Sequence, residues 1–112
     1  MKKVEAIVRS EKLEEIKDGL LKVGVRGLTI SQVLGAGNQK GHKEFYRGAE
    51  VTINLLQKIK IEIVAEDAHV NDIVEIISKC AKTGEIGDGK IFVYNIENVI
   101  RIRTGESGEK AI

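Results

Sequence analysis

Residues 84 to 91, GEIGDGKI, have the spacing of a phosphate-binding loop: a glycine, four residues, then Gly89 and Lys90. In the ATPase form of this loop a Ser or Thr follows the lysine and binds Mg²⁺, and the loop joins a strand to a helix. Here Ile91 follows the lysine, a helical pattern precedes the loop and a strand pattern follows it. The segment therefore fails as an ATPase signature, although its glycine amides and its ammonium group could still hold an anion.

Two further segments carry the same anion-binding chemistry. Residues 35 to 37, GAG, end a strand pattern and offer backbone amides that a ligand can approach closely. Residues 101 to 103, RIR, are predicted to form a strand, which would place Arg101 and Arg103 on one face about 6.6 Å apart. Two guanidinium groups at that spacing could grip neighbouring phosphate oxygens. Each segment alone also fits turn glycines or a solvated strand face, but together they indicate a polyphosphate site.

No catalytic or zinc-binding set accompanies these segments. The sequence shows no Ser-His-acid combination, and neither His42 nor His69 has a cysteine or second histidine at zinc-ligand spacing. Cys80 is the single cysteine, and its place in an apolar helical stripe predicts a buried, inert thiol. The predicted polyphosphate site thus has no nucleophile and no general base.

The composition of the chain limits which classes of protein it can belong to. A chain of 112 residues predicts one domain, residues 1–112, with a modest core. The net charge of +1 offers no global attraction to nucleic acid or to an anionic membrane, so an anion site must come from local clustering. The sequence has no signal-peptide pattern and no apolar run near membrane length. We therefore expect a cytoplasmic protein that binds no nucleic acid.

The chain reads as two similar strand-helix-strand halves. Strands are predicted at residues 3–9, 28–34, 58–64 and 90–96 from their alternating or apolar patterns. Ser10 and Asp67 are predicted to cap the two helices, and Gly24 to end the first. The helical stripes superpose at an offset of 57 residues. Their members are Leu13, Ile16, Leu20 and Val23 in the first half, and Val70, Ile73, Ile77 and Cys80 in the second.

A strand-helix-strand unit that occurs twice predicts an α+β fold of the ferredoxin-like split type, in the order βαββαβ. The sheet would be antiparallel, with both helices on one face. The other face would mix Ile7 and Val64 with the charged Arg9, Lys60 and Glu62. We therefore expect that face to meet another subunit.

Residues 35–55 form a long connection between the second and third strands of this pattern. Connections of this length in a small domain are commonly functional. Phe45 and Tyr46 lie beside Arg47, and aromatic residues next to an arginine are typical of an interaction surface. The alternative is a hairpin tip without a role.

The strand IFVYNI, residues 91–96, resembles the shorter RNA-stacking strand of RNA-recognition domains, which share this topology. The longer aromatic motif that accompanies it is missing, so core or interface packing explains Phe92 and Tyr94 better. An RNA-binding or scaffolding domain of the same fold remains the alternative function.

Six stretches carry a family resemblance: KKVEAIVR, GLTISQVLGAG, NQKGHKEFYRGAEV, KIKIEIV, TGEIGDGKIFV and VIRIRTGE. Over essentially its whole length the chain resembles the P-II nitrogen-regulatory signal proteins. The resemblance implies a homotrimer with nucleotide sites in the clefts between subunits. It also implies a sensor without enzymatic activity, which binds ATP or ADP and, beside ATP and Mg²⁺, 2-oxoglutarate. The expected partner is an Amt-type ammonium channel or another nitrogen-metabolism regulator or enzyme, so the membrane is met only through a channel.

The resemblance also assigns residues. It implies a nucleotide site of Thr29 and Val64 at the adenine, of Gly35, Gly37, Asn38, Gln39, Gly87, Asp88, Gly89 and Lys90 at the ribose and phosphates, and of Arg101 and Arg103 from the neighbouring subunit. It implies 2-oxoglutarate contacts from Gln39, Lys40, Gly41, Lys58 and Gly87, with Gln39 completing the Mg²⁺ sphere. The tip of the docking loop would be Phe45, Tyr46, Arg47 and Glu50, and the sequence leaves the loop's fold open.

Four positions depart from the family pattern. Ala36 and Asn38 stand where the family commonly has Phe and Arg, which removes one cation near the phosphates and leaves the ranking of ATP against ADP open. Val51 stands where many members have a uridylylated tyrosine, and Ala49 where another branch has a phosphorylated serine. We therefore predict signalling by ligand binding alone.

Overall fold

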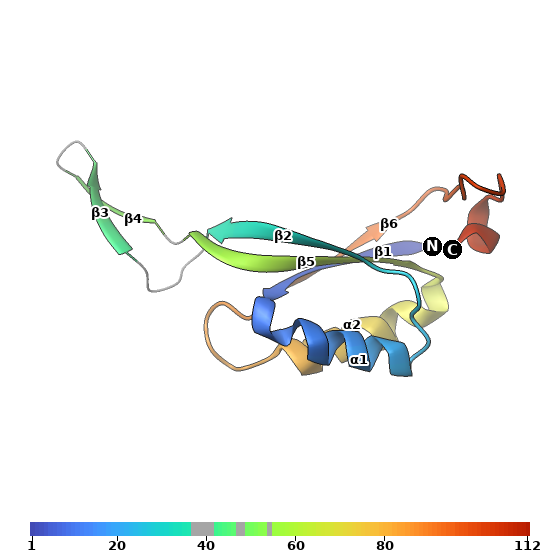
Figure 1. The fold of residues 1–112 in the computed structure, drawn as a ribbon, viewed down its shortest axis with the longest axis horizontal. Helices are drawn as coiled ribbons and strands as arrows, with labels where there is room; N and C mark the ends of the chain where they lie inside the picture. Colours follow the sequence, from blue (N-terminus) through green and yellow to red (C-terminus); the bar gives the residue numbers. More distant parts are fainter. Residues whose placement is uncertain (37–41, 47–48, 54) are drawn as a thin grey trace.

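The computed structural model describes residues 1–36, 42–46, 49–53 and 55–112 of the chain (Figure 1). The elements in chain order are β1 (Lys2–Arg9), the 3-10 turn η1 (Ser10–Lys12), α1 (Leu13–Lys22), β2 (Thr29–Ala36), β3 (His42–Tyr46), β4 (Ala49–Ile53), β5 (Leu55–Ala65), α2 (Asp67–Ala81), β6 (Gly89–Asn95) and the 3-10 turn η2 (Gly108–Ala111). No helix in the described parts of the chain is long and apolar enough to cross a membrane.

The main sheet has four strands in the order β2-β5-β1-β6, and every neighbouring pair is antiparallel. Both helices lie on one face of this sheet (Figure 1). The predicted ferredoxin-like α+β fold is therefore confirmed. Between β2 and β5, where the sequence left the fold of the connection open, β3 and β4 pair as a separate two-stranded sheet.

The core lies between the sheet and the two helices because strand residues alternate between the faces. Val4, Ala6 and Val8 of β1 pair with Ile63, Ile61 and Ile59 of β5, and all six side chains are buried. Ile16 and Leu20 of α1 and Ile73 and Ile77 of α2 close the core from the helix side. Three members of the predicted stripes differ: Val23 is 40% exposed because α1 ends at Lys22, and Leu13 and Cys80 are only partly buried.

The predicted helix caps at Ser10 and Asp67 are wrong. Ser10 begins η1 instead, and Asp67 is already the first residue of α2, one position too late to cap it. Its carboxylate lies 2.9 Å from the amino group of Met1, which is the nearest cation at that end of the sheet. The predicted stop at Gly24 is confirmed, since its φ of 89° reverses the chain after α1.

The uncovered face of the sheet has the mixed composition that the sequence predicts. The register puts Ser31, Lys60, Ile7 and Lys90 in one row across the strands, and Thr29, Glu62, Glu5 and Phe92 in the next. Phe92 and Tyr94 are 43% and 42% exposed, so they do not pack in the core of this chain, and interface packing, the other predicted role, stays a prediction. The Tyr94 hydroxyl donates to the Glu5 carboxylate at 2.9 Å, which raises the pKa of the phenol.

Candidate functional site

The loop between α2 and β6 is organised around the side chain of Asp88. One carboxylate oxygen accepts backbone N–H groups from Thr83 at 2.8 Å and from Gly84 at 2.9 Å. The other accepts the Thr83 hydroxyl and, at 3.3 Å, the Nε–H of Arg9. The Thr83 hydroxyl contributes most to holding the pKa of Asp88 well below its usual value, ahead of the backbone N–H groups. Asp88 is thus ionised, and its hydrogen bonds go to its own loop and to β1.

Two cations from neighbouring strands hold the backbone of the same loop. Arg9 and Lys58 are paired across β1 and β5. The Arg9 guanidinium donates to the carbonyl oxygen of Ile86 at 2.8 Å, and the Lys58 ammonium donates to that of Gly87 at 2.6 Å. In a trans peptide the N–H points opposite to the carbonyl. The N–H groups of Gly87 and Asp88 are therefore directed away from these cations, as in an anion-binding loop.

Lys58 is buried, with a relative exposure of 8%. Burial lowers its pKa, and the nearby positive charge of Arg9 lowers it further. A Cβ atom built on Gly35 of β2 would lie 3.3 Å from Cγ of Lys58, so the glycine leaves room for the lysine stem. The structure thus brings Gly35, Lys58, Gly87 and Asp88 together, while their predicted contacts with nucleotide and 2-oxoglutarate stay predictions.

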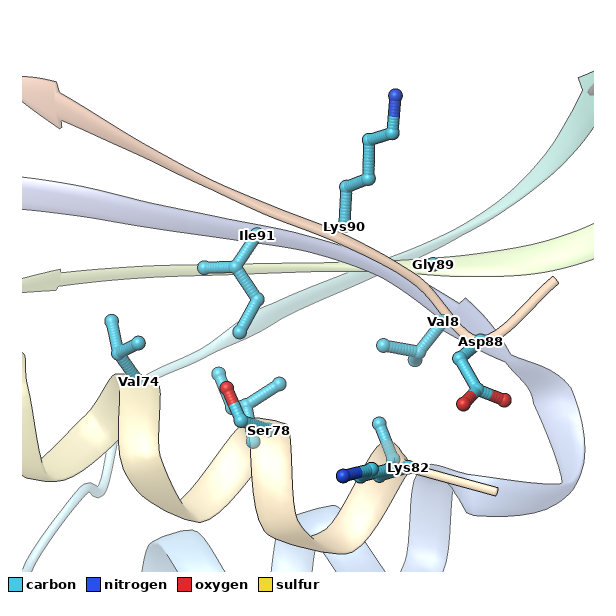
Figure 2. Close-up of a pocket in the computed structure, with 10 residues that line it drawn as sticks. Val8, Val74, Ser78, Lys82, Asp88, Gly89, Lys90 and Ile91 are labelled. Atoms are coloured by element: carbon cyan, nitrogen blue, oxygen red, sulfur yellow. The ribbon is translucent and has the colours of Figure 1, made fainter. Parts of the chain in front are cut away.

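Gly89 joins this loop to β6 in a conformation that requires glycine. Its φ is +106°, and a Cβ atom built there would lie 1.7 Å from the carbonyl oxygen of Ile7. This close approach lets β6 begin at once beside β1. Lys90, the next residue, then projects from the sheet face opposite α2 (Figure 2). The register places it in the row of Ile7 and Lys60.

A cleft of about 350 Å³ lies on the other side of this loop, between α2 and β6 (Figure 2). Val8, Val74, Ile77 and Ile91 form much of its wall, and Ile91 points into it while Lys90 points away. Aliphatic walls suit a polyphosphate poorly. Asp88 and Gly89 contribute to the lining of the cleft, but the Lys90 ammonium points away from it.

Thr29 and Val64 lie at the far end of the sheet. They line a cavity of about 830 Å³, together with Val25, Leu28 and Ile112 among others. Val64 is six residues from Lys58 along β5, which corresponds to about 20 Å. Lys58 contacts Gly87, one of the residues predicted to hold the phosphates. Within one chain the residues predicted to hold the adenine are therefore separated from those predicted to hold the phosphates.

Arg101 and Arg103 do not lie on a strand, so that prediction is wrong. The chain reverses over these residues: the Arg101 N–H donates to the carbonyl oxygen of Glu106, and the Arg101 carbonyl accepts the N–H of Gly105, both at 2.8 Å. Both arginine side chains are exposed, and that of Arg101 donates to the carbonyl oxygen of Ile112 at 3.3 Å. Figure 1 shows this C-terminal segment at the opposite end of the sheet from the loop that precedes β6.

Several predicted residues lie outside the described ones: Gly37, Asn38, Gln39, Lys40, Gly41 and Arg47. The backbones of Phe45 and Tyr46 belong to β3 and that of Glu50 to β4, where Phe45 pairs with Glu50. Among the residues that the structure describes, no three His, Cys, Asp or Glu side chains gather to hold a metal ion. His69 is exposed in the first turn of α2.

Sequence reasoning missed Thr83 and Arg9. The signal for Thr83 was present in TGEIGD, since a hydroxyl at the start of a short loop can bond an aspartate at its end. Arg9 could be found only through the pairing of β1 with β6, which brings residue 8 opposite residue 89.

The chain is similar to known proteins over nearly its whole length. The family model described as Nitrogen regulatory protein P-II matches residues 1–106. The chain is 55% identical to the nitrogen regulatory protein P-II of Rhodospirillum rubrum and 54% identical to that of Pasteurella multocida, in both cases over the full length of both chains. The solved structure titled "Structure of B. subtilis GlnK" is similar with a TM-score of 0.84 and 47% identity, covering 99% of this chain and 97% of that one.

Proposed function

We propose a function from the premise that this chain belongs to the P-II family of nitrogen regulatory proteins, to which the family model and the curated relatives assign it. Proteins of this family are signal-transduction regulators of nitrogen metabolism and not enzymes. This chain would bind ATP or ADP and, beside ATP and Mg²⁺, 2-oxoglutarate. It would report their levels to a target protein through residues 35–55.

The observation that carries this proposal is the attachment of the loop carbonyls to Arg9 and Lys58. Because these carbonyls are held, the N–H groups of Gly87 and Asp88 would be directed toward phosphate oxygens, with the ammonium of Lys90 nearby. Hydrogen bonds from such groups to an ionised acceptor contribute about 1.5–3 kcal/mol each. The site has several cations, which suits the binding of an anionic nucleotide.

Lys58 would give this site a second ligand, a carboxylate. Among the described residues its buried ammonium has one carbonyl acceptor at hydrogen-bond distance, and a carboxylate would be a stronger acceptor than a neutral carbonyl. We assign it to a carboxylate of 2-oxoglutarate, with Gln39, Lys40, Gly41 and the backbone of Gly87. Asp88 is engaged within its loop, so Mg²⁺ would be held by the nucleotide phosphates and Gln39.

The complete site would form between copies of the chain. The residues proposed to bind the phosphates and those proposed to bind the adenine lie about 20 Å apart along β5, at opposite ends of one sheet. Placing the loop end of one subunit against the far end of the next would join them, and would bring in Arg101 and Arg103. A homotrimer, a cyclic arrangement in which each subunit uses both ends, satisfies this requirement with three equal sites.

The target would be met by the long segment between β2 and β5, whose β3–β4 hairpin carries Tyr46 and Glu50. We propose an Amt-type ammonium channel as the partner, with Arg47 entering its cytoplasmic mouth in the ADP-bound state and withdrawing with ATP and 2-oxoglutarate. The protein would thus act in the cytoplasm. Val51 and Ala49 have no hydroxyl group to modify, so ligands alone would set the state of this segment.

Isothermal titration calorimetry tests the proposal. ATP and ADP should each bind, and 2-oxoglutarate should bind only in the presence of ATP and Mg²⁺. Lys58→Met should abolish the 2-oxoglutarate signal, since it leaves one ligand carboxylate unpaired. Tight 2-oxoglutarate binding without nucleotide, or binding of single-stranded RNA in place of ATP, would contradict it and favour the RNA-binding alternative.

A further inference from the structure

We infer that Thr83 and Asp88 are positioning residues for the nucleotide loop: the hydroxyl and the carboxylate shape the loop and do not touch the nucleotide. This inference rests on the proposed function. It also revises the role expected for Asp88, which the family resemblance places along the ribose and phosphates. Thr83 has no role in that resemblance.

The hydrogen bonds of Asp88 leave its carboxylate little capacity for a ligand. A carboxylate has about four lone-pair sites. Asp88 accepts from four donors within the chain, namely the Thr83 N–H, the Thr83 hydroxyl, the Gly84 N–H and the Arg9 guanidinium. A ribose hydroxyl could bond this carboxylate only by displacing one of these donors. The geometry therefore assigns the carboxylate to the loop itself.

The direction of the carboxylate also matters for the charge of the site. A free carboxylate next to bound phosphates would repel them. Hydrogen bonds from Thr83 and Gly84 hold the negatively charged carboxylate of Asp88 against its own loop. The guanidinium of Arg9 lies beside it as a counter-ion. The anion then meets the loop amides and Lys90, which projects from the sheet face opposite α2 (Figure 2).

Thr83 is the residue on which this arrangement depends most. Its hydroxyl donates to Asp88 and, at the same time, accepts the backbone N–H of Glu85 at 3.1 Å. Thr83→Val keeps the shape and the backbone N–H of residue 83. It removes the partner of the Glu85 N–H and leaves one Asp88 carboxylate oxygen with the Arg9 guanidinium as its only donor within this set. Thr83→Ser keeps both bonds. The pair of variants therefore isolates the hydroxyl.

The test compares five full-length proteins by ATP affinity: wild type, Thr83→Val, Thr83→Ser, Asp88→Asn and Asp18→Asn. Asp18 is an exposed carboxylate on α1 and controls for the change in charge. We expect Thr83→Val and Asp88→Asn each to weaken ATP by roughly 3- to 10-fold, the effect of losing one hydrogen bond that orders the loop. Thr83→Ser and Asp18→Asn should stay within about twofold of wild type.

A second readout needs no nucleotide. In the ligand-free proteins, amide hydrogen exchange over residues 84–89 should be faster in Thr83→Val and Asp88→Asn than in wild type, and unchanged in Thr83→Ser. If Asp88→Asn weakens ATP while Thr83→Val does not, Asp88 touches the nucleotide directly and the inference is wrong. Unchanged exchange in both variants also overturns it. Absence of ATP binding in wild type would instead refute the proposed function, whatever the exchange shows.

Discussion

Gly89→Ala is the substitution for which the structure specifies the sharpest outcome. The new Cβ atom would lie 1.7 Å from the carbonyl oxygen of Ile7, whereas ordinary contacts begin at 3.4 Å. Residue 89 would therefore have to move away from β1 by more than 1 Å. That movement breaks the first pairs of the β1–β6 ladder, Val8 with Gly89 and Ile7 with Lys90.

The loss of stability in Gly89→Ala has two parts. A non-glycine residue at this φ of +106° costs about 1–2 kcal/mol. Losing one or two backbone hydrogen bonds of the ladder adds about 1–2 kcal/mol, since each contributes about 0.5–1.5 kcal/mol net. We therefore expect Gly89→Ala to lower the free energy of unfolding by about 2–4 kcal/mol.

Gly24→Ala is the matched control. Gly24 has a φ of +89°, but a Cβ atom there meets nothing within 4 Å, so the variant carries the backbone cost alone. Urea unfolding of both variants, at one protein concentration because assembly would affect stability, gives the two free energies. If Gly89→Ala is no less stable than Gly24→Ala, the close approach of β6 to Ile7 is wrong.

Three further predictions concern the helix pair, the loop and the arginines. Gly19→Ala should lower the free energy of unfolding by about 1 kcal/mol, measured by urea unfolding. The new Cβ would lie 2.8 Å from Cγ2 of Ile76, and the cost of this overpacking outweighs the gain in helix propensity. A more stable variant would contradict this. The folded pKa of Asp88 is held below its ordinary 3.8, so its contribution to stability is present above that pH and is lost as pH falls below it. The difference in unfolding midpoint between wild type and Asp88→Asn should therefore shrink between pH 6 and pH 2.5, and a constant difference would count against the hydrogen bonds from Thr83. Arg101→Ala and Arg103→Ala should each weaken ATP by roughly 10- to 150-fold in calorimetry, with a smaller effect on ADP, and unchanged affinity in both would remove them from the site.

The alternation of apolar residues was sufficient to predict the fold. Val4, Ala6 and Val8 in one strand and Ile59, Ile61 and Ile63 in another can bury only one face each, and two helical stripes of similar spacing cover that face. Helix starts were predicted less well. Asp67 was assigned as a cap because of its residue type, but one position decides whether a carboxylate reaches the helix amides or the Met1 amine.

The candidate site was predicted only where its residues are neighbours in sequence. The glycines of the loop and Lys90 are visible as a motif, whereas Arg9 reaches the loop through a strand pairing that no local pattern contains. Arg101 and Arg103 alternate with apolar residues, which predicted a strand, but Gly105 reverses the chain within two residues of Arg103.

We propose that each nucleotide site is built from the loop end of one chain and the far end of another. Subunit mixing tests it directly. Lys90→Ala damages only the loop end, and the double variant Arg101→Ala/Arg103→Ala damages only the other end, so each protein alone should bind ATP weakly. After the two are unfolded together and refolded, random assembly pairs an intact loop with intact arginines in about a quarter of the clefts, and calorimetry should recover about that fraction of tight sites. If no tight binding returns in the mixture, each site lies within one chain and the account is contradicted.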